Sequence, residues 1–206
     1  MKRRVFLICI FLVSLIMINC NVNAKDSNGD IVLNTPEQTG GLPLLDAIMQ
    51  RRTNRQISKE MISDEELSTL LWTAWGYNSK DFKRVVPTAR NTQAMDLYVA
   101  TKDGFYLYDA KENKLIKKGN KDLREIISGG QEFAKGAPLH LLFVTADRKY
   151  GDFHAGSMYQ NASLYCASQK LACVVRALFD RDILSKEIGL EGDSKVIMTL
   201  AVGKNQ

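Results

Sequence analysis

The chain has 206 residues, of which 45% are hydrophobic and 25% charged, with a formal net charge of +5. Its length suits one domain, alone or with arms, and it has no internal repeat or low-complexity tract. The first 24 positions hold three basic and no acidic residues, so the rest of the chain carries only +2. The remaining lysines are scattered, and the charge therefore gives no argument for nucleic-acid binding.

The first 24 residues have the pattern of a secretory signal peptide. Basic residues 2–4 precede an apolar run over 5–18 of about 14 residues, which is shorter than the ~20 of a membrane span. Val-Asn-Ala at 22–24 suits a signal peptidase, so we expect a mature chain from Lys25 that is exported to the bacterial periplasm. Two alternatives stay open: lipidation of Cys20, which the asparagine before it disfavours, and a retained anchor helix.

Residues 25–43 are polar and rich in turn residues and are expected to form an extended arm, followed by one domain over 44–206. Hydrophobic periodicity predicts helices from Leu44, after Ser63, over 122–134 with a break at Gly129-Gly130, over 153–174 and over 181–188. Alternating or continuous apolar runs predict strands over 96–101, 105–109, 115–117, 139–145 and 196–202. Because helices and strands intermix without a regular βα repeat, we expect an α+β fold with a mostly antiparallel sheet.

Three local signals refine this outline. The first helix carries one apolar face made of Leu44, Leu45, Ile48 and Met49. Ser63 and Glu66 have capping-box spacing. The segment 76–94 is a loop long enough that we expect it to be functional.

The cysteines and histidines of the mature chain give no redox or metal signature. Cys166 and Cys173, if both lie on the 153–174 helix, are ~10 Å apart, which exceeds the ~7 Å limit for a disulfide. They are interpreted as small buried hydrophobic residues. His140 and His154 belong to no metal-ligand spacing, so no metal site is predicted.

The strongest chemical motif is Arg51-Arg52-Thr53-Asn54-Arg55, at the end of the first helix. Guanidinium groups bind phosphate through two hydrogen bonds and keep their charge, so this turn is a candidate phosphate clamp. The alternative is a solvated basic helix end, which the helix dipole favours. Lys204, in the last strand, is either a further phosphate ligand or a terminal charge.

A second motif runs from Arg84 to Gln93, Arg-Val-Val-Pro-Thr-Ala-Arg-Asn-Thr-Gln, just before the first strand. Its alternative interpretation is a plain turn-forming loop. The usual nucleotide and hydrolase motifs, GxGxxG and GxSxG, are absent, and the P-loop spacing at 151–156 is followed by Ser157 in place of lysine.

Together these two motifs carry a resemblance. Arg-Arg-Thr-x-Arg about 35 residues before Pro-Thr-Ala-x-Asn-x-Gln, with strands directly after, resembles the nitroreductase superfamily. Residues 70–76 (Leu-Leu-Trp-Thr-Ala-Trp-Gly) and 104–109 (Gly-Phe-Tyr-Leu-Tyr-Asp) look like its azoline-oxidase-like branch. The resemblance covers roughly residues 44–204, and it implies a three-layer α/β/α sandwich with helices flanking a mostly antiparallel central sheet.

The resemblance also implies an FMN-dependent oxidoreductase that reduces small electrophiles such as nitroaromatics or quinones by ping-pong flavin chemistry. Two subunits of a homodimer would build two sites at their interface, with no catalytic acid or base, because the flavin itself carries the hydride. By position, the flavin phosphate, ribityl chain and pyrimidine edge would be held by Arg51, Thr53 and Arg55, with Arg52 close by and Lys204 at the phosphate. The partner subunit would contribute Pro87, Thr88, Ala89 and Asn91. Contacts near the reactive edge would come from Val175, Arg176 and Ala177.

Two features bear on the substrate and the electron donor: residues that differ from the family pattern, and the expected export of the protein. Ala94 and Met95 replace the usual Pro-Trp, and the Lys/Tyr pair of thiazoline-forming oxidases has no counterpart that we could place. An exported enzyme lacks free NAD(P)H, so either another envelope donor reduces the flavin or the signal interpretation is wrong. Two other functions stay open: a non-catalytic exported flavin- or ligand-binding module, and an envelope protein that has lost the cofactor.

Overall fold

A computed structural model of the protein describes residues 25–78 and 81–206, so the expected signal peptide and Cys20 lie outside the described residues. The described strands are β1 (Ile31–Val32), β2 (Asp96–Thr101), β3 (Gly104–Asp109), β4 (Lys114–Gly119), β5 (Leu139–Thr145), β6 (Leu171–Arg176) and β7 (Lys195–Lys204). The described helices are α1 (Leu44–Gln50), α2 (Asp64–Trp75), α3 (Arg124–Ser128), α4 (Glu132–Gly136), α5 (Gly151–Ser168) and α6 (Arg181–Glu187), with a short 3₁₀ turn, η1 (Ala89–Asn91).

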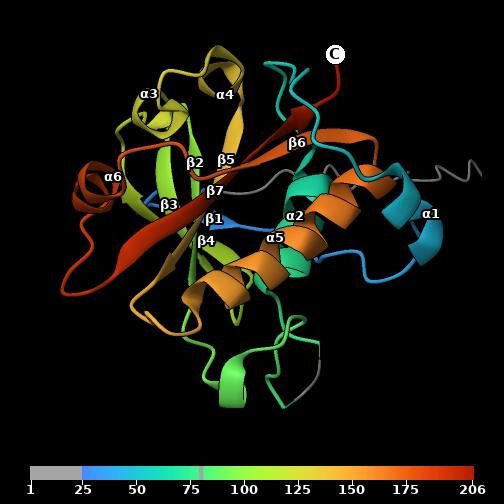
Figure 1. Ribbon diagram of the computed structural model, residues 1–206, viewed down its shortest axis with the longest axis horizontal. Helices are drawn as coiled ribbons and strands as arrows, with labels where there is room; N and C mark the ends of the chain where they lie inside the picture. Colours follow the sequence, from blue (N-terminus) through green and yellow to red (C-terminus); the bar gives the residue numbers. More distant parts are fainter. Residues whose placement is uncertain (1–24, 79–80) are drawn as a thin grey trace, which may run out of the picture.

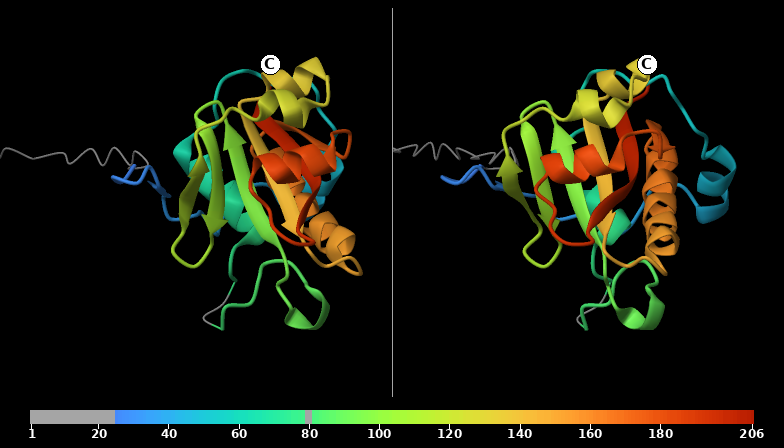
Figure 2. Two further views of the ribbon diagram at one scale, coloured as in Figure 1. Left: turned by 90° about the vertical axis from the view of Figure 1, so that its left-hand side faces the viewer. Right: turned by 60° about the vertical axis from the view of Figure 1, so that its left-hand side comes forward.

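The strands form one sheet in the order β1-β4-β3-β2-β5-β7-β6, and every one of these neighbouring pairs is antiparallel. Helices α2 and α5 cover one face of the sheet, while α3 and α6 cover the other, as the two views in Figure 2 show. Helix α1 lies outside α5, away from the sheet (Figure 1). The predicted α+β fold with a three-layer α/β/α arrangement is confirmed.

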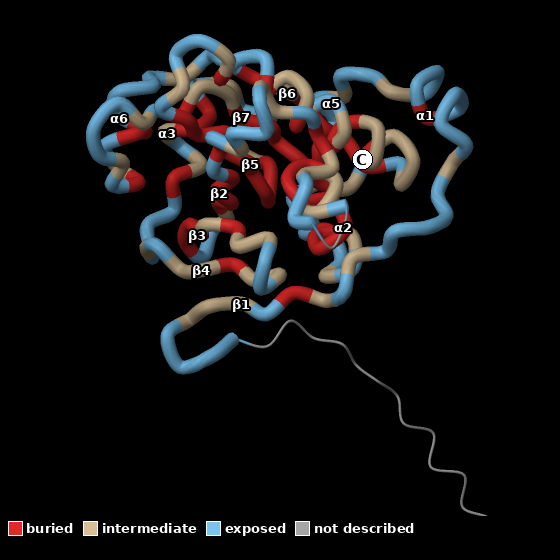
Figure 3. The backbone as a smooth tube through the Cα atoms, turned by 90° about the horizontal axis from the view of Figure 1, so that it is seen from below, coloured by how far each residue is buried: buried red, intermediate tan, exposed pale blue. Residues whose placement is uncertain are grey.

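Strand β5 is the centre of this sandwich, since all seven of its residues are buried. Its side chains alternate between the two cores: Leu141 and Phe143 pack on the α2/α5 side, and Leu142 and Val144 on the α3/α6 side. Figure 3 shows this buried centre in red beneath an exposed outer layer. A strand that is buried on both faces has a continuous run of apolar residues in its sequence. For this reason the sequence predicted the position of β5 well.

Two local predictions about helix ends are confirmed. Ser63 and Glu66 make the capping box at the start of α2, with both reciprocal hydrogen bonds present. The break at Gly129-Gly130 separates α3 from α4, because Gly129 has φ of 53° and a Cβ there would meet the Leu178 carbonyl oxygen at 2.4 Å.

The prediction of one helix over 153–174 is wrong at its C-terminal end. Helix α5 ends at Ser168, Lys170 turns the chain with φ of 57°, and residues 171–176 form the edge strand β6. A short apolar run of this kind does not distinguish helix from strand by periodicity, and pairing with β7 decides it.

This correction changes the relation of the two cysteines. Cys166 on α5 and Cys173 on β6 are both free and buried, as predicted, but they are not on one helix. The Cys166 thiol donates to the Cys173 sulfur, which raises the pKa of Cys166 and lowers that of Cys173. The ~10 Å separation expected from helix geometry is therefore wrong.

The expected arm, residues 25–43, contributes β1, whose two residues pair with β4 at the edge of the sheet. Among residues 25–78 and 81–206, no helix combines the length and apolar character needed to cross a membrane.

The apolar face of α1 is turned to solvent. Leu44, Leu45, Ile48 and Met49 are 66%, 73%, 47% and 70% exposed, and Ala47 is the buried residue of this helix. Contiguous apolar surface of this kind marks an interaction site.

Buried His140 predicts a pH dependence of stability. Its Nε2 lies 2.9 Å from the Ala134 carbonyl oxygen, and burial lowers its pKa from 6.5 to about 4. Between these values the unfolded chain binds the proton and the folded chain does not, so stability falls as the pH drops from about 6.5 to about 4, by an amount on the order of 3 kcal/mol.

The check is denaturant unfolding at pH 7, 5.5 and 4 of the wild type and of His140→Gln, which keeps a donor for Ala134. The variant should lose less stability over this range than the wild type. Identical pH profiles for the two proteins would contradict a neutral buried His140.

Candidate functional site

The basic segment Arg51–Arg55 follows α1 directly and runs toward the C-terminal end of the chain. Arg51 is half-buried, whereas Arg52, Thr53 and Arg55 are exposed. The Arg52 Nη1 donates to the carbonyl oxygens of Met49 and Arg51, both at 2.8 Å, so this side chain closes the end of the helix.

Backbone hydrogen bonds hold this segment against the ends of β6 and β7. The Asn54 N–H donates to the Cys173 carbonyl oxygen at 3.1 Å, and the Ser58 N–H donates to that of Lys204 at 2.8 Å. The Asn54 side chain also donates to Asn205 Oδ1 at 2.8 Å. The predicted phosphate residues Arg51–Arg55 and Lys204, 150 residues apart in the chain, therefore lie at one end of the molecule (Figure 1).

A phenylalanine connects this segment with the third predicted group, Val175–Ala177. The guanidinium carbon of Arg55 lies 5.7 Å from the centroid of the Phe133 ring, and that of Arg176 lies 5.9 Å from the same ring. Both distances are within cation–π range. Val175 is half-buried and Ala177 is exposed, so the chain reaches the molecular surface at the C-terminal end of β6.

The Arg176 side chain is engaged inside the protein. Its guanidinium donates to Gln131 Oε1 at 2.8 Å and to backbone carbonyls of Ile127, Ser128 and Leu178. It is 5% exposed, and burial lowers its pKa. It caps the last carbonyls of α3, which leaves the backbone of this residue, rather than its side chain, for ligand contact.

Lys204 forms an ion pair with Glu60, whose Oε1 lies 2.6 Å from the lysine Nζ. Both side chains are substantially exposed, so the pair contributes little stability and an anionic ligand competes readily for the ammonium group.

Between these elements lies a cavity of about 230 Å³. Its lining includes Arg52, Asn54, Lys170, Cys173 and Asn205. It is a polar recess next to the basic segment, of a size that suits a single anionic group rather than a whole cofactor.

The second motif forms most of the loop between α2 and β2, where Arg84 is its main anchor. The Arg84 guanidinium carbon lies 4.2 Å from the Trp75 ring and 4.0 Å from the Tyr77 ring. Its Nη1 donates to the Trp75 carbonyl oxygen at 2.7 Å, and its Nε donates to Gln93 Oε1 at 3.0 Å. Burial lowers the pKa of Arg84, but a guanidinium keeps its charge in proteins.

Histidine 154 is a second anchor, which the sequence analysis missed. The Ala89 N–H donates to the buried His154 Nε2 at 2.8 Å, so this ring nitrogen is the acceptor that fixes the loop at Ala89. The two residues are 65 positions apart, and no spacing in the sequence connects them. Thr88 Oγ1 accepts from the Gln93 N–H at 3.2 Å, which leaves its hydroxyl hydrogen to donate elsewhere.

The structure brings together two of the three predicted groups and separates the third. The segments 51–55 and 203–206 lie at the end of the molecule that carries the C-terminus, and Arg176, opposite Thr199 in the sheet, joins them through the Phe133 ring that it shares with Arg55, while the loop that contains η1 lies at the opposite end (Figures 1 and 2). One chain therefore does not place the loop residues over its own basic segment.

With this geometry established, comparison with known proteins is decisive. The sequence model of the nitroreductase family matches residues 48–204. The chain belongs to the nitroreductase family. It is thereby a nitroreductase-type oxidoreductase, and the matched span contains every residue of the candidate site.

Known relatives agree with the assignment to the nitroreductase family. A crystal structure of a nitroreductase-type protein from Ralstonia eutropha is 33% identical, with a TM-score of 0.80 over 86% of this chain and 90% of that one. A Methanocaldococcus jannaschii protein named as a nitroreductase is 25% identical over 163 residues, 69% of this chain and 82% of its own.

An NADPH:FMN oxidoreductase from Vibrio harveyi, crystallised with NAD⁺, shares the fold at 16% identity, with a TM-score of 0.61 over 79% of this chain and 69% of that one.

The His154 anchor predicts the behaviour of matched variants. In His154→Gln the amide oxygen replaces Nε2 as the acceptor for the Ala89 N–H, whereas His154→Leu leaves this N–H without a partner. We expect amide hydrogen exchange at Ala89 to stay slow in the glutamine variant and to accelerate about tenfold or more in the leucine variant. Equal exchange rates in the wild type and His154→Leu would contradict an anchoring role.

Proposed function

We propose that this protein is an FMN-dependent oxidoreductase that works as a homodimer and reduces small electrophiles such as nitroaromatics or quinones. It carries two equivalent sites, each built from both chains. In each site one chain supplies the basic segment, the end of β6 and Lys204, and the partner supplies the loop that carries Pro87, Thr88, Ala89 and Asn91.

The observation that carries this proposal is the distribution of the two motifs over opposite ends of one chain. Both motifs belong to the family pattern, yet they are too far apart to meet within a monomer. A two-fold arrangement brings the loop of one chain to the basic end of the other, and it does so twice.

The exposed face of α1 supports the same arrangement. Its four large apolar side chains are 47–73% exposed, and α1 leads directly into the basic segment. A homodimer interface over this helix buries the apolar face and lies next to the cofactor site.

The residues of the basic end fit a flavin mononucleotide. Arg51 and Arg55 offer guanidinium groups for the phosphate and the pyrimidine edge, Thr53 offers a hydroxyl, and Lys204 adds an ammonium group. The flavin, when bound, supplies the hydride chemistry. The chain itself contributes positive charge that favours the reduced, anionic cofactor, and loop residues that orient a small acceptor.

The cellular setting is part of the proposal. We place the protein outside the cytoplasm on the strength of residues 1–24, with Cys20 as a possible lipid anchor, and its reductant is then an envelope donor or NAD(P)H. Mass spectrometry of the protein from membrane and periplasmic fractions tests this, because cleavage before Lys25 and lipidation at Cys20 give different N-termini.

The first experiment is an absorbance spectrum of the purified protein after incubation with FMN and gel filtration. The wild type should retain flavin bands. An Arg51→Ala/Arg55→Ala variant should bind FMN at least about a hundredfold more weakly, because each charged hydrogen bond to phosphate contributes roughly 1.5–3 kcal/mol.

A variant with the same loss of charge, Arg148→Ala/Arg181→Ala, is the control, since both arginines are exposed and lie outside the candidate site. It should bind FMN like the wild type. A wild-type protein that retains no flavin would overturn the proposal. A protein that retains flavin which neither NAD(P)H nor dithionite can reduce would be a binding module without catalysis.

The dimer has its own test. Leu45→Glu/Met49→Glu places two charges on the exposed face of α1, and the structure of the single chain tolerates them, because both side chains already face solvent. We expect light scattering to show a dimer for the wild type and a monomer for the variant, with loss of bound flavin. Leu178→Glu/Ile183→Glu, on another exposed apolar surface, should remain dimeric. A variant of α1 that stays dimeric would place the interface elsewhere.

A further inference from the structure

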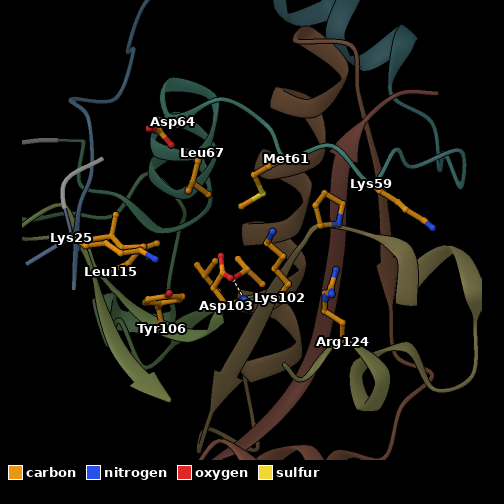
Figure 4. A pocket seen from close by; sticks show the side chains of 14 residues that line it. Lys25, Lys59, Met61, Asp64, Leu67, Lys102, Asp103, Tyr106, Leu115 and Arg124 are labelled. Atoms are coloured by element: carbon orange, nitrogen blue, oxygen red, sulfur yellow. Dashed lines mark hydrogen bonds between the residues drawn. The ribbon is translucent and has the colours of Figure 1, made fainter. Parts of the chain in front are cut away.

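A second cavity, of about 420 Å³, lies between α2 and the β2–β3 hairpin (Figure 4). Its walls are mainly apolar and come from six elements or segments, with Ile31, Met61, Leu67, Val99, Tyr106 and Leu115 as their apolar residues. None of its lining residues belongs to the candidate flavin site. Its volume falls within the range of about 300–1,000 Å³ that small-molecule sites occupy.

The polar residues of this cavity are predominantly basic. Four cationic side chains, Lys25, Lys59, Lys102 and Arg124, line it together with two carboxylates. Arg124 is paired with Asp122 at 2.7 Å, whereas the three lysines have no ion-pair partner within residues 25–78 and 81–206. The lining side chains, four cations and two carboxylates, therefore carry a net charge of +2.

The basic groups are not spread evenly around the cavity. In Figure 4 the Lys102 and Arg124 side chains lie at one side with the Asp103 carboxylate next to Lys102, Lys25 lies at the other side, and Lys59 points away. Leu67 and Met61 extend into the space between them. The cavity thus has one charged side, with two cations and one carboxylate, that adjoins an apolar interior.

The turn of the hairpin fixes the position of Lys102. The Asp103 N–H donates to Thr101 Oγ1 at 3.2 Å, and Gly104 has φ of 129°. A Cβ at Gly104 would lie 2.1 Å from the Gly119 carbonyl oxygen, so the turn packs closely on the end of β4 and has little freedom to move.

We propose that this cavity binds a small amphiphile with one carboxylate head and an apolar body. The carboxylate is held by Lys102 and Arg124, and the body packs against Leu67, Met61 and Tyr106. Burial of an apolar chain of about seven carbons supplies most of the affinity, at roughly 0.8 kcal/mol per buried methylene group, and the cations select the head group. The site is separate from flavin binding and does not rest on it.

Calorimetric titration of the purified protein with octanoate, 1-octanol and octylammonium tests the proposal, because these probes differ in head group while their apolar chains differ by a single carbon, so that the extra carbon of the two others works against the expected preference for octanoate. We expect saturable binding of one octanoate per chain. Octanol should bind about tenfold more weakly, and octylammonium more weakly still.

Three variants locate the binding. Lys102→Glu should weaken octanoate binding about tenfold or more. Lys111→Glu, the same charge change at an exposed lysine outside the cavity, should leave it unchanged. Met61→Trp should abolish binding of all three probes, because Met61 lines the cavity, and at 39% exposure it accepts a larger side chain without disturbing the core.

Each of four results would overturn the proposal. Two concern the probes: octanoate does not bind, or octanol binds as tightly as octanoate. Two concern the variants: Lys102→Glu and Lys111→Glu weaken octanoate binding equally, or Met61→Trp leaves it unchanged. Retention of FMN, measured in the same preparations by absorbance, is expected to be the same in all three variants, so failure of this site is distinguishable from failure of the flavin site.

Discussion

The burial of β5 on both faces is the constraint on which the rest of the structure depends. A strand with seven consecutive buried residues is stable only if both sides of the sheet are covered, so helices are needed in two layers. β7 pairs with β5 along most of its length, and its last two residues extend beyond β5 and pair with β6 alone. There Lys204 hydrogen-bonds to residue 58, which sets the position of the basic segment.

The loop at the other end of the molecule is held differently. Arg90, Asn91 and Gln93 have φ values of 53°, 55° and 50°, which are unfavourable for residues other than glycine and cost on the order of 1 kcal/mol each. No strand pairing holds these three residues; Arg84 hydrogen-bonds to Gln93, and His154 holds the neighbouring Ala89. Such strain persists only where the surroundings fix the conformation, which is consistent with a loop that has to present particular atoms to a ligand.

Sequence reasoning predicted what depends on local pattern. The central strand, the capping box of Ser63 and the break at Gly129 each follow from a few neighbouring residues, and all three are confirmed. Contacts between distant segments were not predictable in this way. The strand at 171–176 forms because β7 lies beside it, and the His154 anchor and the Cys166–Cys173 contact depend on the same tertiary arrangement. The roles of the predicted flavin residues come from family resemblance and stay predictions.

A site divided between two chains has a thermodynamic consequence. If the cofactor contacts both subunits, it binds the dimer more tightly than the monomer, and by linkage it must stabilise the dimer by the same free energy. The exposed face of α1 then need not be large enough to hold two chains together alone, because part of the association free energy comes from the cofactor. Under this proposal the protein without flavin dissociates on dilution at higher concentrations than the protein with flavin. The cavity between α2 and the β2–β3 hairpin shares no residue with the proposed flavin site. Binding of a ligand there is therefore not expected to change the dimerisation free energy.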